Sequence, residues 1–395
     1  SLIKSMSRTL FSEDSKKTMI SYPFPDVYRQ EIFPQPDPSF LTGVPLFLGI
    51  AQKGPINEPM MLHLWQQFAA IFGDSDDGYL SYAVRGFFEN GGQVAYVLRL
   101  NDDVTVTPLE SLRKGLTAVS DLETCDLICA PDLIRNTNLN DLITLQKEIV
   151  NHCQLLGDRF AILDTGNNLN REKLIEQSKA LNSSFGALYH PWLTVRDASG
   201  RPHAIPPCGH IAGIYARSDQ LVGVHKAPAN EVLDGVISLQ KKLTKIDQTE
   251  LFKNNINMLR SFTGRGIRVW GARTLSTDPV WQYVNVRRLF IAVGRWLTQF
   301  MTLLPFEPND ARLWVRISRE VEAYLQTVYQ QGALKGQTAK QAFYVRCDEE
   351  TNGQDVRDAG QVVTQIGLAP AVPGEFIDLR VVRGNSGVTV TAAAG

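Results

Sequence analysis

Short apolar runs and amphipathic segments alternate along the chain from Gly43 to about residue 195, and this alternation restricts the fold more than any other feature. GVPLFLGIA (43–51) has the apolar run of a buried strand, whereas HLWQQFAAIFG (63–73) repeats its apolar side chains at helical spacing and closes on a glycine. Such alternation favours an α/β layer with a mixed, largely parallel sheet covered by helices. The same pattern predicts strands at 93–100, 125–130, 160–164 and 187–195 and helices at 79–92, 108–119, 139–154 and 170–182.

The pattern changes in the rest of the chain. A turn-rich loop is expected at 196–209, followed by a helix at 209–219 and a domain boundary near residue 250. The sequence therefore predicts an α/β domain over 43–250 and an α+β core domain over 251–385. The elements expected after the boundary are strands at 266–275, 343–348 and 375–383 and two long amphipathic helices at 285–304 and 309–331.

Both ends of the chain are predicted to be extended. Five prolines between residues 23 and 38 prevent a continuous helix in the first 42 residues, so this segment is expected to form an arm. Near the other end, SGVTVTAAAG (386–395) alternates valine and threonine as a short strand does. Such a strand needs an existing sheet edge, which favours β-augmentation between subunits; a frayed terminus is the alternative.

Composition excludes several classes of protein. The 395 residues carry 40 Lys and Arg against 41 Asp and Glu, without the excess of positive charge that a nucleic-acid binder shows. The longest apolar runs, such as Val44–Ile50, are far shorter than the ~20 residues of a membrane helix, so no direct membrane insertion is expected. The first residues lack an apolar signal core, and the five cysteines are scattered rather than arranged as a disulfide scaffold. We therefore expect the chain to be made in the cytoplasm.

One short motif has the residues of a catalytic site. Asp164-Thr165-Gly166 follows an apolar strand and matches the signature of aspartic proteases, in which two carboxylates share a proton and activate water. A single copy requires two chains with their loops facing each other, and a strand that ends in Asp-x-Gly is also an ordinary turn. An aspartic-type hydrolase built on Asp164 is therefore kept as an alternative function.

A second set of residues has the side chains of a metal site without its usual spacing. His203, Cys208 and His210 lie close together in PHAIPPCGH, and His190 is a distant candidate for the fourth ligand. Buried thiols and loop histidines are the simpler interpretation. The sequence also contains no P-loop pattern and no nucleophile elbow. We therefore expect no enzyme activity, no cofactor and no bound metal.

The helix expected over 309–331 carries a row of arginines beside its apolar stripe. An unpaired arginine row can contact an acidic partner, although rows of charge are more often simply solvated. The stripe consists of Leu313, Ile317, Val321, Leu325 and Val328, and the row consists of Arg312, Arg316 and Arg319.

Several blocks of sequence, taken in order, resemble the tail sheath family of contractile injection machines, which includes contractile phage tails, R-type pyocins and extracellular phage-like particles. The third block has Cys208 where the family usually has serine. The blocks are PDVYRQEI (25–32), GVPLFLGIAQKGPINEP (43–59), PPCGHIAGIYARSDQLVGVHKAPAN (206–230), RGIRVWGARTLSTDPVWQYVNVRRLF (265–290), LLPFEPNDARLWVRI (303–317) and GLAPAVPGEFIDLRV (367–381).

This resemblance implies a structural function. Subunits of the family form hexameric rings stacked around an inner tube, and contraction drives the tube through a target envelope. The α/β part corresponds to the family's outer domain, and the N-terminal arm and C-terminal strand of neighbouring subunits complete the sheet of the C-terminal domain. The residues expected to take part in this exchange are Val27 and Tyr28 in the arm and Val388, Thr389, Val390 and Thr391 in the C-terminal strand.

The expected partners follow from the same resemblance. They are other copies of the chain, the inner tube protein, and baseplate and terminator proteins. Arg312, Arg316 and Arg319 are our candidates for a patch that faces the tube, with Arg287 and Arg288 as alternatives. We expect assembly in the cytoplasm into a phage tail or a tail-like particle that is released from the cell. A baseplate-proximal or terminating sheath paralogue is a further alternative.

Overall fold

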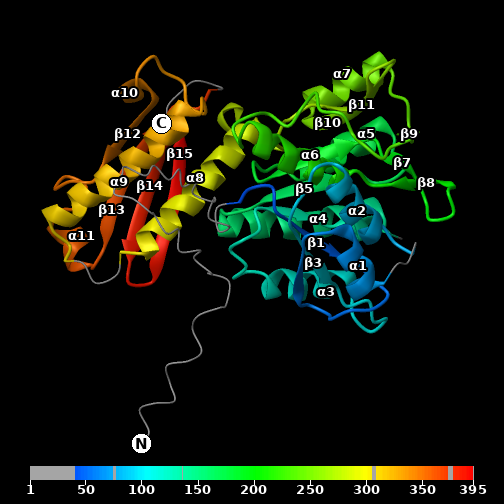
Figure 1. Ribbon diagram of the computed structural model, residues 1–395, viewed down its shortest axis with the longest axis horizontal. Helices are drawn as coiled ribbons and strands as arrows, with labels where there is room; N and C mark the ends of the chain where they lie inside the picture. Colours follow the sequence, from blue (N-terminus) through cyan, green and yellow to red (C-terminus); the bar gives the residue numbers. More distant parts are fainter. Residues whose placement is uncertain (1–40, 74–76, 136, 305–307, 372–376, 395) are drawn as a thin grey trace, which may run out of the picture. The chain divides into compact units, whose positions relative to one another are not determined.

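The fold is described from a computed structural model that places residues 41–73, 77–135, 137–304, 308–371 and 377–394 (Figure 1). All of these residues belong to one compact unit. The arm predicted over residues 1–42, including Val27 and Tyr28, lies outside the described residues except for its last two.

An eight-stranded sheet organises the α/β domain. Its inner strands run parallel, and antiparallel pairs occur only at its two edges, where β11 pairs with β10 and β2 pairs with β3. The prediction of a mixed, largely parallel sheet is therefore confirmed. In spatial order the strands are β11 (Gly266–Trp270), β10 (Ile256–Phe262), β6 (Gly186–His190), β5 (Phe160–Asp164), β4 (Leu127–Cys129), β1 (Pro45–Gly49), β3 (Ala95–Arg99) and β2 (Pro59–Leu62).

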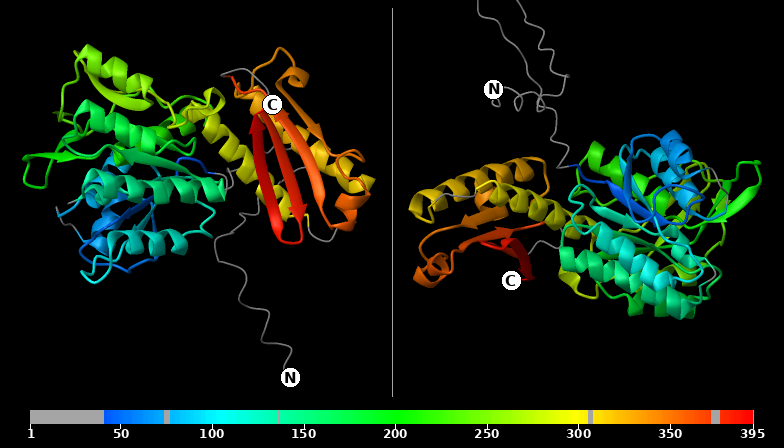
Figure 2. Two further views of the ribbon diagram at one scale, coloured as in Figure 1. Left: turned by 180° about the vertical axis from the view of Figure 1, so that it is seen from behind. Right: turned by 90° about the horizontal axis from the view of Figure 1, so that it is seen from below.

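Helices cover both faces of this sheet, as the view from below in Figure 2 shows. Because successive side chains of a strand point to opposite faces, Phe47 of β1 enters one core, whereas Leu46 and Leu48 enter the other. Burial on both faces explains why the strands read as unbroken apolar runs. The first core is closed by α1 (Trp65–Phe72), α2 (Leu80–Glu89) and α6 (Cys208–Leu221), and the second by α3 (Pro108–Ala118), α4 (Leu139–Leu156), α5 (Arg171–Ala180) and α7 (Lys245–Lys253).

Two glycines bring α6 into close contact with α2. A Cβ atom at Gly209 would lie 2.2 Å from the carbonyl oxygen of Ala83, and one at Gly213 would lie 2.6 Å from the carbonyl oxygen of Phe87. Neither position can therefore accept a side chain without moving a backbone. This contact sets the position of Cys208 at the first turn of α6.

The α/β domain differs from the sequence prediction at several places, and β2, α7 and β10 were not predicted at all. The strand expected at 187–195 is two strands, β6 and β7 (Leu193–Arg196), because Pro191 between them has no N–H for a strand ladder. The expected loop contains β8 (Pro202–Ile205), which forms a three-stranded sheet with β7 and β9 (Ser238–Leu239). The boundary predicted near residue 250 falls inside the domain, because β10 pairs in parallel with β6 and extends the large sheet.

The C-terminal domain has two long helices on one face of a four-stranded antiparallel sheet (Figure 2). The apolar stripe predicted from Leu313 to Val328 is buried between these helices and the sheet, as expected. The elements are α8 (Val284–Thr302), α9 (Ala311–Gln330), α10 (Ala339–Ala342), α11 (Gln354–Asp358), β12 (Phe343–Arg346), β13 (Val362–Leu368), β14 (Ile377–Gly384) and β15 (Gly387–Ala394); short 3₁₀ helices lie at Pro131–Ile134 and Pro279–Trp281.

The strand predicted at the C-terminus forms within its own chain. β15 pairs antiparallel with β14 through the two-residue turn Asn385-Ser386, so the sheet edge that the strand requires is supplied by its own subunit. Val388 and Val390 pack toward the helices, and Thr389 and Thr391 are exposed, as the alternation predicts. We predicted a separate strand that pairs with a neighbour; in the structure, residues 388–391 are instead the edge strand of their own sheet.

Candidate functional site

β15 lies at one edge of the four-stranded sheet of the C-terminal domain. Within the described residues, β15 is the last strand of its sheet, and it pairs only with β14. Its sequence, GVTVTAAA, contains neither a charged residue nor a proline, the features by which natural edge strands usually avoid pairing with another chain. Alternate residues along this eight-residue strand therefore present their backbone donors and acceptors to a further strand.

The arginine row of α9 lies on the exposed side of that helix. Arg312, Arg316 and Arg319 are all exposed, and Val315 between them is also exposed. Arg319 forms an ion pair of 2.8 Å with Glu320, so part of its charge is already compensated. The structure thus places the three candidates together on one surface that includes an apolar side chain.

Arg288 is buried and cannot contact a tube, so this alternative from the sequence is wrong. Its guanidinium group lies 2.6 Å from the carboxylate of Asp219 and 3.0 Å from that of Asp126, and it lies over the ring of Tyr215. Burial raises the pKa of the Asp219 carboxyl group, and the charge of Arg288 opposes that rise. Two acids and one base therefore form a buried cluster that holds the first half of α8 against the α/β domain.

Arg287, the other alternative, is buried beside it. Its guanidinium group donates to the Ser184 hydroxyl at 2.6 Å and lies between the rings of Trp281 and Phe185. Burial lowers the pKa of Arg287 to about 9. Both arginines of this block are therefore structural.

The buried cluster also holds the start of the described chain. The Asp126 carboxylate accepts hydrogen bonds from the backbone N–H groups of Gly43 (3.1 Å) and Val44 (2.7 Å). Further along α8, Arg295 donates to the carbonyl oxygens of Leu41 and Glu123. The segment that leads out of the predicted arm is therefore attached to α8 through charged and polar contacts.

Asp164, the candidate catalytic acid, is a buried structural residue. Its carboxylate accepts a hydrogen bond of 2.8 Å from the backbone N–H of Cys208, at the first turn of α6, and satisfies an N–H that the helix leaves unpaired. Burial raises the pKa of Asp164 to about 7, and the hydrogen bonds from Cys208 reduce the rise. With 3% of its surface exposed, Asp164 is out of reach of a substrate.

The candidate metal ligands do not come together. His203 stacks on the ring of Tyr82, with 5.0 Å between the ring centroids, and the Nδ1 atom of His190 lies 2.8 Å from the Thr165 hydroxyl. The described residues contain no group of three or more His, Cys, Asp and Glu side chains arranged to hold a metal ion. All five cysteines are buried and free.

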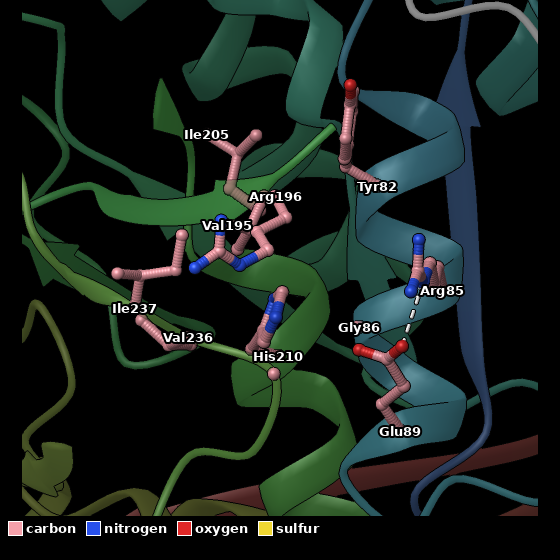
Figure 3. Close-up of a pocket in the computed structure, with 11 residues that line it drawn as sticks. Tyr82, Arg85, Gly86, Glu89, Val195, Arg196, Ile205, His210, Val236 and Ile237 are labelled. Atoms are coloured by element: carbon pink, nitrogen blue, oxygen red, sulfur yellow. Dashed lines mark hydrogen bonds and ion pairs between the residues drawn. The ribbon is translucent and has the colours of Figure 1, made fainter. Parts of the chain in front are cut away.

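A cavity of about 360 Å³ lies between α2, α6 and the β7–β8 hairpin (Figure 3). Arg85 and Glu89 form an ion pair of 2.8 Å on its α2 side, and His210 lies beside Gly86, where a Cβ atom would be 2.3 Å from the imidazole. Burial, together with the charge of Arg85, lowers the pKa of His210 to about 4, so the ring is neutral. No serine, threonine or cysteine lines this cavity among the described residues, so it lacks the usual nucleophile of a hydrolase.

Among the described residues, no helix is both long enough and apolar enough to span a bilayer.

Comparison with known proteins assigns the family. The phage tail sheath protein central domain matches residues 112–275, and the phage tail sheath C-terminal domain matches residues 276–383. The chain belongs to the phage tail sheath family. The junction of the two matched domains lies just after β11, which agrees with the end of the large sheet rather than with the boundary predicted near residue 250.

Solved structures of sheath proteins have the same fold. A chain of the anti-feeding prophage helical sheath in its contracted state is 30% identical, with a TM-score of 0.70, over 90% of this chain and 98% of that chain. A chain of the contracted sheath complex of PVC, an extracellular contractile injection system, is 28% identical, with a TM-score of 0.70, over 89% and 95% of the two chains. A chain of the anti-feeding prophage baseplate is 29% identical, with a TM-score of 0.72, over 90% and 98%.

Some curated relatives are longer than this chain. The tail sheath protein of Salmonella phage ViI is 28% identical over 259 residues, which is 64% of this chain and 40% of that protein. The present chain thus spans less than half the length of this relative. Membership of the sheath family supports the structural role that the sequence predicted.

Proposed function

We propose that the chain is the main structural subunit of a contractile sheath, in which hexameric rings stack around an inner tube and contract to drive the tube through a target envelope. The observation that carries the proposal is the likeness to the contracted anti-feeding prophage sheath over nearly the whole of both chains. Assembly in the cytoplasm and release as a phage-tail-like particle belong to the same proposal, since one of the similar structures is the sheath complex of an extracellular contractile injection system.

The exposed edge of β15 supports strand exchange between subunits. Backbone hydrogen bonds formed along an edge persist while the ordinary contacts between subunits slide and repack, which is what a contracting lattice requires. We propose that the extended arm of a neighbouring copy, around Val27 and Tyr28, adds to the edge formed by Gly387–Ala394. Residues 388–391 then serve as the accepting edge, while they stay in their own sheet.

The exposed arginines of α9 support a contact with the tube. Positive charge at the surface gives a contact that forms quickly and is weakened by salt, so it can be released when the sheath contracts. Arg312, Arg316 and Arg319 are proposed for this role. The other proposed partners are baseplate and terminator proteins, and no cofactor, nucleic acid or membrane insertion is part of the proposal.

The test is to produce the chain together with its tube protein and to image the particles by electron microscopy. We expect long cylinders of stacked six-membered rings; a chain that stays monomeric with its tube present contradicts the proposal. Rings at one end of the particle only would identify the terminating or baseplate-proximal paralogue, an alternative that the likeness to the baseplate chain favours.

Strand exchange is tested by deleting residues 386–395. The deletion should stop ring stacking, because it removes the accepting edge. Val388 and Val390 also pack on the core, so circular dichroism must show that the truncated chain still folds. Normal cylinders from the truncated chain would contradict strand exchange and leave the sheath assignment intact.

A further inference from the structure

An apolar groove of about 670 Å³ lies at the β11 edge of the large sheet. Phe252, at the end of α7, and Trp270, at the end of β11, line it, and both side chains are exposed. Large aromatic side chains at a groove are the residues that most often dominate protein–protein contacts. The surface formed by α7, β10 and β11 therefore has the composition of an interface.

Positive charge surrounds these aromatic side chains. Arg260 lies over the Trp270 ring at 5.4 Å, and Lys245 is exposed on α7. Neither Arg260 nor Lys245 has a carboxylate partner among the residues that the structure describes, whereas many other surface arginines do. The groove thus fits an apolar side chain flanked by acidic residues.

The chain itself carries such a group on the loop that follows β3. Val104 is fully exposed, at 101% of its reference area, and it follows Asp102 and Asp103 directly. Asp103 accepts hydrogen bonds from the backbone N–H and the hydroxyl of Thr105, so the loop holds Val104 in one position. A loop that is already ordered loses little conformational entropy when it docks.

The two surfaces cannot meet within one molecule. β3 lies next to the β2 edge of the eight-stranded sheet, and the groove lies at the β11 edge, with four strands between β3 and β10 (Figure 1). Complementary patches at opposite edges of a subunit produce head-to-tail contacts, which close into rings when the rotation allows it. This is the symmetry that a ring of identical subunits needs.

We propose that the Asp102-Asp103-Val104 loop of one copy docks into the groove of Phe252 and Trp270 on the next copy. The inference rests on the proposed function, because only an assembly of copies brings the loop and the groove together. Val104 contacts the two aromatic side chains, and the aspartates lie beside Arg260 and Lys245.

Cysteine cross-linking tests the contact directly. All five native cysteines are buried, so surface cysteines introduced at Val104→Cys and Thr249→Cys, the latter at the groove, react selectively. Chains with one substitution are mixed with chains that carry the other, assembled with the tube and treated with a short bismaleimide. We expect covalent dimers well above those from a control mixture of Leu155→Cys and Thr249→Cys, since Leu155 is 85% exposed on α4, away from the loop.

The possible outcomes separate this inference from the proposed function. Cylinders that assemble but give no dimers above the control overturn the docking of the loop and leave the sheath function standing. A complete failure of unmodified chains to assemble overturns both.

A charge exchange adds a second, independent readout. Asp102→Arg or Arg260→Asp alone should raise the concentration needed for assembly about tenfold, as expected for the loss of a close interfacial charge pair; Asp102→Arg also removes the 3.5 Å ion pair between Asp102 and Arg99 within the subunit. The two substitutions together should restore much of the loss, because the charges are again opposite. If the concentration that the double variant needs for assembly rises by the product of the two single increases, the proposed pairing is overturned.

Discussion

Replacement of Arg288 by methionine should destabilise the chain strongly. Methionine retains much of the length of the side chain but leaves the buried carboxylates of Asp126 and Asp219 without their cation. Removal of one partner from a buried ion pair typically costs about 3–5 kcal/mol, because the remaining charge stays out of water. We expect a loss in this range in the free energy of unfolding, measured by urea denaturation at pH 7.

The adjacent arginine provides the matched control. Arg287 is also buried on α8, but its guanidinium group contacts a hydroxyl group and two aromatic rings. Arg287→Met loses these contacts but leaves no buried carboxylate without its cation. We therefore expect the free energy of unfolding to fall by about 1–2 kcal/mol. The difference between the two variants isolates the electrostatic part of the loss.

The stability lost in the Arg288→Met variant should depend on pH in a defined direction. Burial already raises the folded-state pKa of Asp219 above its usual value of 3.8, and loss of Arg288 raises it further. A raised folded-state pKa means that stability is greatest below the unfolded pKa and is lost as the pH rises through the folded pKa. The variant should therefore recover stability relative to the wild type on acidification, and addition of Asp219→Asn should recover part of it at pH 7. Equal losses for Arg287→Met and Arg288→Met at all pH values would refute the reasoning.

Three further predictions follow from named contacts. Reversal of charge at Arg312, Arg316 and Arg319 should weaken assembly on the tube more than self-assembly, as co-sedimentation with the tube measures, whereas the same reversal at the exposed Lys147, Lys173 and Lys179 should not. Asp164→Asn should leave assembly intact, whereas a hydrolase would lose all turnover. Because the folded-state pKa of Asp164 is about 7, Asp164 contributes stability that is lost as the pH rises from about 4 to above 7, so the stability of the variant relative to the wild type should rise over this range in urea denaturation. Gly209→Ala should cost about 1–3 kcal/mol through its clash with the Ala83 carbonyl oxygen, while Gly353→Ala, with no atom within 4 Å, should be neutral in thermal unfolding.

Much of the α/β domain could be predicted from the sequence because its strands are buried on both faces. A strand such as β5, FAILD, is apolar up to its last residue, and the helix that follows is mostly polar, so the pattern of the apolar residues changes clearly at this junction. The stripe of α9 was predictable for the same reason, since five buried side chains recur at helical spacing on an otherwise polar helix. The sequence blocks shared with sheath proteins then supplied the family, which the comparisons confirm.

The remaining features depend on pairing at a distance, which local pattern does not reveal. Nothing in the sequence of β10 indicates that it joins β6, almost 70 residues earlier, so the boundary near residue 250 was placed too early. The prolines and glycines of 196–209 predicted a loop, so β8, which is short and partly exposed, was missed. Arg287 and Arg288 were interpreted as possible surface residues because arginine is rarely buried. Asp219 and Asp126, which are far apart in sequence, make the burial of Arg288 possible, whereas Arg287 is buried against Ser184 and the rings of Phe185 and Trp281.

These distant contacts meet on one helix, and that arrangement has a mechanical consequence. The first half of α8 is bound by Arg288 to Asp126, whose carboxylate also holds the backbone of Gly43 and Val44, where the chain leaves the arm. The second half packs in the C-terminal core, and Gly294 lies 3.8 Å, measured from an ideal Cβ, from the side chain of Val390 on β15. Under the proposed strand exchange, a pull on the arm and a pull on β15 both act on α8. Because a helix of 19 residues is stiff along its axis, it passes such a load between the two cores rather than absorbing it, provided that the buried ion cluster holds.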